Sequence, residues 1–286
     1  MVQAAERVRD VIPTTAKVHS VECADSFGQL SEQEAMYAYY MTRASWEGSK
    51  ICWFQRSYEG PALLVILKLV FSKGISAAKA KAVAAGLPED QWTMFMAYSA
   101  AVFNNCGNFR SFGDTKFVPE LPEESFVTIL RSCDAYQTHA DVIDDCWARI
   151  SREVYTEEDP HQHIGFPDKN GVTGYYSANV TSEDATFMDT FCQANNISPL
   201  NTRFFKSEDG KNFNLRIASQ YADPTRMPYL KRYELEDGVS VDVTAADFDA
   251  FMTKLTDSIE QAKRYTANEN QRNMLVNYEE HFRYGE

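Results

Sequence analysis

The first half of the chain carries apolar stripes at helical spacing, separated by short breaks that contain glycine or proline. Ser31 followed by Glu34 is a capping box, which predicts a helix start. Gly48 is expected to end that helix before a second one over residues 49–57. Gly60-Pro61 predicts the start of a deeply buried helix, because apolar residues then cover most of its circumference. Further helices are expected over residues 76–85, 88–102, 122–130 and 139–154.

The second half of the chain shows strand-like patterns. Residues 173–180 are rich in Tyr and Val and predict a strand, and a helix is expected from Thr181 and Ser182 to Asn195. Residues 201–206 and 212–218 predict a hairpin, because apolar and polar positions alternate strictly in the second segment. A second hairpin is expected over 229–236 and 239–243, around the turn Asp237-Gly238. Two helices should follow, from Thr244 and over 271–282.

The order of these elements predicts an α+β fold. We expect N-terminal helices wrapped around a small antiparallel β-barrel or rolled sheet, followed by C-terminal helices. The predicted organisation is a helical part over residues 1–154, a connecting loop over 155–172, and a β-barrel with flanking helices over 173–286, all within one structural lobe. The last helix runs to Glu286 without a clear cap, so we expect the natural protein to continue beyond it.

Residues 104–122 stand out between two predicted helices. This segment contains Gly, Asn, Asp and Pro, which favour turns and stop helices, together with three Phe. It is too aromatic for a solvated linker, so we expect an ordered, partly buried loop that is able to carry function. The residues alone leave two interpretations open. Asn108 and Asp114 could satisfy loop amides while Phe112 and Phe117 anchor the loop in the core, or the loop could border a cleft.

Composition narrows the possible partners. The 286 residues include 28 Lys and Arg against 41 Asp and Glu, a formal net charge of −13, so nucleic acid is a poor partner. The most apolar run, 62–71, is about half of a membrane span and contains Lys68. The N-terminal ten residues lack the apolar core of a secretory signal, and the six cysteines show no paired spacing. We therefore expect a cytoplasmic protein with reduced thiols and no membrane partner.

No familiar catalytic motif is present. His161 and His163 are the one histidine pair, but no third ligand accompanies them at a fixed spacing, and a solvated linker is the simpler interpretation. Cys106 could be a nucleophile, but it has no identifiable histidine partner, so we interpret it as a structural thiol. The paired carboxylates lie at helix starts, in turns or on polar faces, and those at helix starts complement the helix dipole. The sequence therefore predicts no catalytic residue and no metal ligand.

The segment 108–119, with the sequence NFRSFGDTKFVP, resembles a signature segment of the dipeptidyl peptidase III family of zinc exopeptidases. Shorter matches follow in the same order at 30–44, 176–181, 201–206 and 262–275. The resemblance extends from about Val21 to the end of the chain.

This resemblance implies a fold and an activity. Family members are longer, with two lobes around a cleft and a small five-stranded β-barrel in the lower lobe. They remove dipeptides from the N-terminus of short peptides, using one zinc ion held by a His-Glu-x-x-x-His helix and a downstream Glu in the upper lobe. None of that zinc machinery is in these 286 residues, so the resemblance implies zinc bound outside this chain. Its implied substrate-binding residues are Ser111, Phe112 and Gly113, while residues 114–118 hold the loop in shape.

Three hypotheses follow. The chain is the substrate-cleft portion of such a peptidase, inactive without its C-terminal zinc lobe and with short peptides as ligands. Alternatively, it is a shortened, non-catalytic relative that binds peptides or a partner protein. The third hypothesis is an independent hydrolase that uses His161 and His163.

Overall fold

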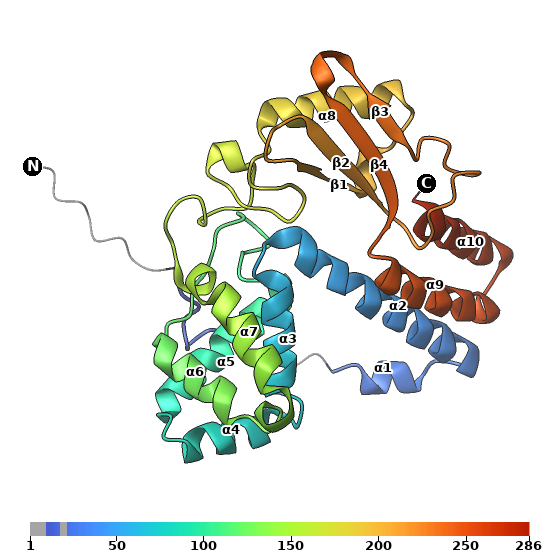
Figure 1. Cartoon of the computed structure of the whole chain (residues 1–286). Coiled ribbons are helices and arrows are strands. Elements are labelled where there is room, and N and C mark those ends of the chain that lie inside the picture. The colour runs from blue at the N-terminus through green and yellow to red at the C-terminus, as the bar shows by residue number, and fades with distance from the viewer. Residues whose placement is uncertain (1–9, 18–21, 286) are drawn as a thin grey trace, which may run out of the picture. The chain divides into compact units, whose positions relative to one another are not determined.

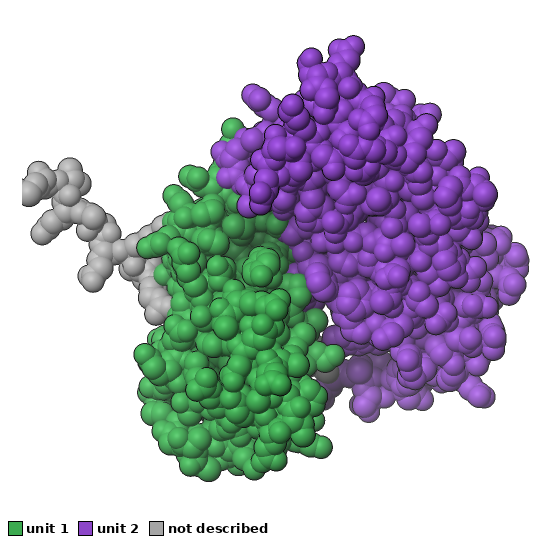
Figure 2. Space-filling model, in the orientation of Figure 1, with its two compact units in different colours: residues 1–18, 56–165, 169–173 green, residues 19–55, 166–168, 174–286 purple. Residues whose placement is uncertain are grey.

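The computed structural model describes residues 10–17 and 22–285, so Val21 and Glu286 lie outside the described residues. The chain divides into two compact units (Figure 2). Unit 1 contains residues 1–18, 56–165 and 169–173, and unit 2 contains residues 19–55, 166–168 and 174–286. Unit 2 therefore draws on two distant parts of the sequence, with most of unit 1 inserted between them.

Unit 1 is helical (Figure 1). Its helices are α3 (Gly60–Val70), α4 (Ile75–Ala84), α5 (Glu89–Asn105), α6 (Glu123–Ser132) and α7 (Tyr136–Tyr155). Aromatic rings form its core: Phe126 lies 5.2 Å from Phe95 and 4.4 Å from Trp147, measured between ring centroids. Because these rings belong to α5, α6 and α7, their burial joins the three helices. The predicted helix starts at Gly60-Pro61 and after Pro88 and Pro122 are confirmed.

Unit 2 combines helices with a small sheet (Figure 1). Its helices are α1 (Ala24–Gly28), α2 (Glu32–Arg56, whose last residue falls in unit 1), α8 (Ser182–Ala194), α9 (Asp249–Ala262) and α10 (Glu269–Tyr284). The Ser31–Glu34 capping box is confirmed, with the Ser31 N–H donating to Glu34 Oε2 at 2.9 Å. The predicted break at Gly48 is wrong, because α2 runs through it. A Cβ at position 48 would lie 3.1 Å from Leu255 Cδ1, so this glycine serves the close approach of α2 to α9.

The sheet has four strands in the order β1-β2-β4-β3. They are β1 (Thr202–Lys206), β2 (Asn212–Ala218), β3 (Arg232–Glu234) and β4 (Ser240–Asp247). Apolar side chains of the sheet pack against α8 in one cluster that includes Phe213, Leu215, Val241, Val243 and, from α8, Phe191. Both predicted hairpins are confirmed, since β1 pairs antiparallel with β2 and β3 pairs antiparallel with β4.

The α+β class is confirmed, but the antiparallel barrel is wrong. β2 and β4 are parallel neighbours, with Phe213 opposite Val241 and Leu215 opposite Val243. These two strands carry buried apolar residues and occupy the centre, whereas β3 has only three residues, two of them exposed, and is suited to an edge. The two hairpins therefore join through β2 and β4, and the described residues form an open mixed sheet.

Two further predictions about local structure are wrong. Residues 173–180 form no strand, and only Tyr176 bridges to Phe204 at the outer side of β1. The helix predicted from Thr244 begins instead at Asp249, because β4 continues to Asp247. Arg203 donates two hydrogen bonds of 2.7 Å to the Asp247 carboxylate, which joins the end of β4 to β1.

The last helix, α10, has a cap that the sequence analysis missed. Gly285 has a φ of 73° and its N–H donates to the His281 carbonyl at 2.6 Å, which forms a left-handed C-terminal cap.

Among the residues that the structure describes, no single helix has the length and apolar character of a membrane span. Only α3 and α4 taken together pass that test, and they are bent by 84°.

Candidate functional site

The base of loop 104–122 is a short antiparallel ladder in unit 1. Phe109 bridges to Lys116, the Arg110 N–H donates to the Thr115 carbonyl at 2.9 Å, and the Phe117 N–H donates to the Asn108 carbonyl at 3.0 Å. Phe109 and Phe117 are completely buried. The prediction of an ordered, partly buried loop is therefore confirmed.

The tip of this loop, residues 111–114, projects from the base into solvent. The Phe112 side chain is 95% exposed, and Ser111 and Gly113 are exposed beside it. Gly113 and Asp114 reverse the chain with φ values of 95° and 54°. The structure thus brings the three predicted substrate-binding residues together on one exposed turn.

Two side chains outside the tip hold Ser111. The Ser111 N–H donates to Asn105 Oδ1 at 2.8 Å, and Arg56 Nη2 donates to Ser111 Oγ at 2.9 Å. Asn105 ends α5 and Arg56 ends α2, so two helix ends fix the position of Ser111. Sequence reasoning missed both contacts. Asn105 is close enough in sequence to be considered, but nothing in the pattern points to Arg56.

The interpretation of the loop as a purely structural segment is only partly correct. Phe117 is buried as that interpretation requires, whereas Phe112 is not. The Asn108 side chain is completely buried and makes no hydrogen bond to a loop amide among the described residues. Asp114 acts through its backbone, since its carbonyl accepts from the Ile164 N–H at 3.0 Å.

Lys116 fixes the base of the loop from inside unit 1. Its side chain is 1% exposed and its ammonium lies 3.2 Å from Glu59 Oε1. The same ammonium donates to the Glu153 carbonyl and sits 5.3 Å from the centre of the Phe109 ring. Burial lowers the pKa of Lys116, and the negative charge of Glu59 opposes that effect. Glu59 was not predicted, because it lies 57 positions before its partner in the sequence.

The two histidines of 155–172 lie along this loop. The Lys116 N–H donates to the Gln162 carbonyl at 2.9 Å, and His163 bridges to Thr115. Burial lowers the pKa of His161, and the positive charge of Lys116 acts in the same direction. No group of three or more His, Cys, Asp and Glu side chains in the described part of the chain is arranged to hold a metal ion.

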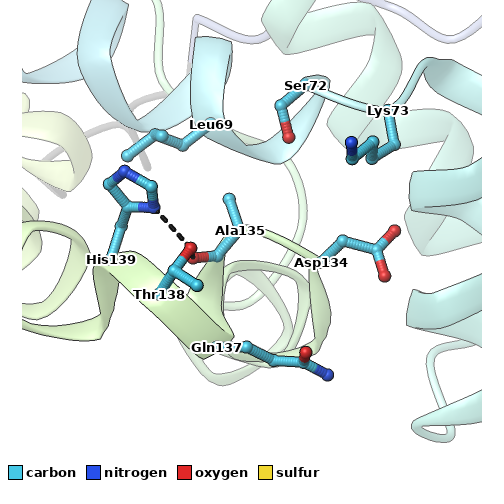
Figure 3. Close-up of a pocket in the computed structure, with 8 residues that line it drawn as sticks. All are labelled: Leu69, Ser72, Lys73, Asp134, Ala135, Gln137, Thr138 and His139. Carbon is cyan, nitrogen blue, oxygen red and sulfur yellow. Dashed lines mark hydrogen bonds between the residues drawn. The ribbon is translucent and has the colours of Figure 1, made fainter.

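Unit 1 also contains a pocket of about 640 Å³, separate from the loop (Figure 3). It lies between the residues that end α3 and those that begin α7, and it is lined by Leu69, Ser72, Lys73, Asp134, Ala135, Gln137, Thr138 and His139. Thr138 Oγ1 lies 2.7 Å from His139 Nδ1, and His139 departs from helical geometry with φ −133° and ψ 28°. Most of the polar residues lining it are exposed, and none of them was a predicted site residue.

Comparison with known proteins places this chain among peptidase sequences. Residues 146–286 match the profile of peptidase family M49. The chain is 35% identical over 295 residues to dipeptidyl peptidase 3 of Nematostella vectensis, an alignment that covers 98% of this chain and 40% of that protein. It is 34% identical over 284 residues to dipeptidyl peptidase 3 of Homo sapiens, covering 96% of this chain and 38% of that protein.

A more distant relative gives the same result. Dipeptidyl peptidase 3 of Dictyostelium discoideum is 32% identical over 272 residues, which cover 95% of this chain and 37% of that protein. The chain thus spans about 40% of the length of the curated relatives it matches.

Proposed function

Because the chain belongs to peptidase family M49, we propose that it supplies the substrate-binding part of a dipeptidyl peptidase III-like zinc enzyme that removes dipeptides from the N-terminus of short peptides. In this proposal the chain is inactive alone, and the zinc ion is bound by residues outside it. The proposal agrees with the donor set of the described residues, which offers no metal-binding group.

The observation that carries this proposal is the exposed tip at residues 111–114 on a rigid base. Phe112 offers an almost fully accessible ring, and covering such a ring with a peptide side chain contributes about 1.5–3 kcal/mol. Ser111 carries a hydroxyl, and Asn105 and Arg56 fix its position. An exposed aromatic ring beside a hydroxyl that is already held in place suits an extended peptide, because the hydroxyl loses little freedom when the peptide binds.

Each part of the tip has a defined role in this proposal. Phe112 contacts an apolar side chain of the peptide, Ser111 exchanges a hydrogen bond with its backbone, and Gly113 allows the peptide to approach closely because it has no side chain. When bound in the complete enzyme, zinc would polarise the scissile carbonyl. The residues of this chain hold and orient the peptide and take no part in bond cleavage.

The test is Phe112→Ala in the complete enzyme. We expect the Kd for a short peptide to rise about tenfold, equivalent to about 1.4 kcal/mol, while the zinc content stays unchanged. Phe27→Ala serves as the matched control, because Phe27 is an exposed phenylalanine of α1 outside the loop, and its replacement should leave the Kd unchanged. Equal affinities for Phe112→Ala and the parent enzyme would refute the assignment.

The second candidate is a non-catalytic relative that binds peptides or a partner protein. The absence of a metal-binding group in the described part of the chain is compatible with it. The longer coding sequence separates the two: a zinc-binding helix in the same reading frame supports the peptidase, and peptide binding without any such helix supports the binding module. A cytoplasmic location remains a prediction.

A further inference from the structure

Asp10, at the start of the described chain, contacts both arms of the loop base that carries the exposed tip. Its carboxylate accepts two hydrogen bonds from the Arg110 guanidinium, one of them from Nε at 3.2 Å. Its backbone carbonyl accepts from the Val118 N–H at 2.8 Å, and the next residue, Val11, bridges to Val118 in parallel. Arg110 lies on the arm that leads into the tip, and Val118 lies on the arm that leads away from it. One residue therefore ties the two arms together.

A third contact fastens Asp10 to another part of unit 1. The Asp10 N–H donates to Glu157 Oε1 at 2.8 Å, and Glu157 comes shortly after α7, which ends at Tyr155. The Arg110 guanidinium also lies 5.8 Å from the centre of the buried Phe117 ring, so it is held by a carboxylate and by an aromatic face. Asp10 thus uses its N–H, its carbonyl and its side chain, each with a different partner.

These contacts lie next to the residues of the tip. The Arg110 N–H donates to the Thr115 carbonyl at 2.9 Å, which closes the ladder where the chain enters and leaves the tip. Ser111 follows Arg110 directly in the chain, so a shift of Arg110 also shifts the Ser111 hydroxyl. A loop that is already ordered loses less freedom when a peptide binds, so contacts at its base raise affinity without touching the peptide.

The ion pair by itself would contribute little to global stability. The Asp10 and Arg110 side chains are each 38% exposed, and exposed ion pairs stabilise a protein only weakly. Its importance comes from its place, because the same residue also holds the opposite arm through the backbone. The effect expected of Asp10 is therefore on the order of the loop rather than on the stability of the whole unit.

We propose that Asp10 is a positioning residue for peptide binding, which clamps the base of the loop and thereby holds Phe112 and Ser111 in place. This inference rests on the proposed function, since Asp10 acts through Arg110 and Val118 rather than on the peptide itself. It gives the described N-terminal segment a role in binding that the tip residues alone do not supply.

Asp10→Asn in the complete enzyme tests this role. The substitution removes the negative charge and keeps the backbone N–H and carbonyl, so the change is centred on the Arg110 contact. We expect the backbone amides of residues 110–118 to exchange hydrogen about threefold faster and the Kd for a short peptide to rise about fivefold. Both kcat and Tm should stay nearly unchanged. Asp145→Asn is the matched control, because Asp145 pairs with Arg149 at 2.9 Å within α7, and it should alter neither exchange in the loop nor the Kd.

A double-mutant cycle with Phe112→Ala distinguishes positioning from an unrelated loss of affinity. If Asp10 acts through the tip, Asp10→Asn should raise the Kd of the Phe112→Ala enzyme by only about twofold or less. Faster exchange together with this coupled loss of affinity would establish the role of Asp10. In an enzyme that binds the peptide, unchanged exchange, an unchanged Kd, or an equal rise in Kd in both backgrounds would overturn that role alone. If the unaltered enzyme binds no peptide, the proposed function fails and the positioning role fails with it.

Discussion

Phe112 and Lys116 are four positions apart in the sequence, yet Phe112 is 95% exposed and Lys116 is 3% exposed. The short ladder at the base of the loop produces this contrast, because it turns residues 108, 109, 116 and 117 inward and leaves residues 111–114 in solvent. A lysine at the inward position requires compensation of its charge, and Glu59 provides it. The position of the exposed ring therefore depends on a buried ion pair.

Removing one partner of this pair should be strongly destabilising. Glu59→Gln leaves the Lys116 ammonium buried without its counter-charge, so we expect a loss of about 3 kcal/mol in the free energy of unfolding. The double variant Glu59→Gln/Lys116→Met removes both charges and should lose less. Urea unfolding of both variants measures this, and a double variant that is less stable than the single one would contradict the argument.

The labelling rates of two cysteine thiols, Cys192 and Cys52, measure how buried each side chain is. Burial raises the pKa of Cys192 to about 11, with a further contribution from Asp189, whereas Cys52 is exposed. At pH 8 little thiolate forms at Cys192, so we expect a thiol reagent to modify it at least about 100-fold more slowly than Cys52. Mass spectrometry of partly labelled protein measures the two rates. Labelling in urea is the control, where the two rates should converge.

Gly174 permits the close contact between the loop before α8 and the end of α2. Its N–H donates to the Gln55 carbonyl at 3.0 Å, and a Cβ at this position would lie 1.7 Å from the Phe54 carbonyl oxygen. We expect Gly174→Ala to lower the free energy of unfolding by about 3 kcal/mol, because backbone must move. Gly28→Ala is the matched control, with nothing within 4 Å of its added carbon, and thermal unfolding should show it to be nearly neutral.

The start of α8 should show a pH-dependent stability. Burial acts to raise the pKa of Asp184, but hydrogen bonds from Lys206 and Thr181 outweigh it, so this pKa is lowered. The resulting stabilisation is present above the unfolded-state pKa of about 4 and is lost as pH falls through the lower folded-state pKa. We expect Asp184→Asn to cost about 2 kcal/mol at pH 7 and much less near pH 2. A difference that stays constant between these pH values would contradict this explanation.

Local signals account for the elements that were predicted correctly. The capping boxes at Ser31 and Thr181 mark helix starts by contacts that span three residues, and strict alternation marks β2. The wrong predictions arise where contacts with residues far away in the sequence determine the local structure. Gly48 continues a helix because Leu255 packs over it, and Asp247 ends a strand because it pairs with Arg203. Both partners lie more than 40 residues away, beyond the reach of a local pattern.

At the candidate site, too, local patterns predict some features and distant contacts determine the others. The composition of loop 104–122 predicts its order and partial burial, but not which of its phenylalanines points outward. The exposure of Phe112 follows from the ladder between Phe109 and Lys116, and the partners Glu59 and Arg56 come from α3 and α2. Resemblance to a peptidase family points to the tip residues as candidates for substrate binding, which stays a prediction, whereas the pattern alone left two interpretations open.

The whole chain provides a test of where the metal is bound. Expressed as these 286 residues, the protein should bind no stoichiometric zinc in calorimetry and should release no dipeptides. A longer polypeptide of the same family serves as the positive control in both assays. Stoichiometric zinc binding by this chain would instead favour the hydrolase hypothesis built on His161 and His163.

The insertion of unit 1 into unit 2 has a consequence for biosynthesis. A ribosome completes α2 well before it reaches α9 and α10, whose apolar residues share clusters with those of α2. At about 5–20 residues per second, this interval lasts roughly 10–40 s. The inserted helices of residues 56–165 are translated within that interval and are able to fold first. The apolar residues that α2 contributes to these clusters therefore stay uncovered until α9 and α10 have been synthesised.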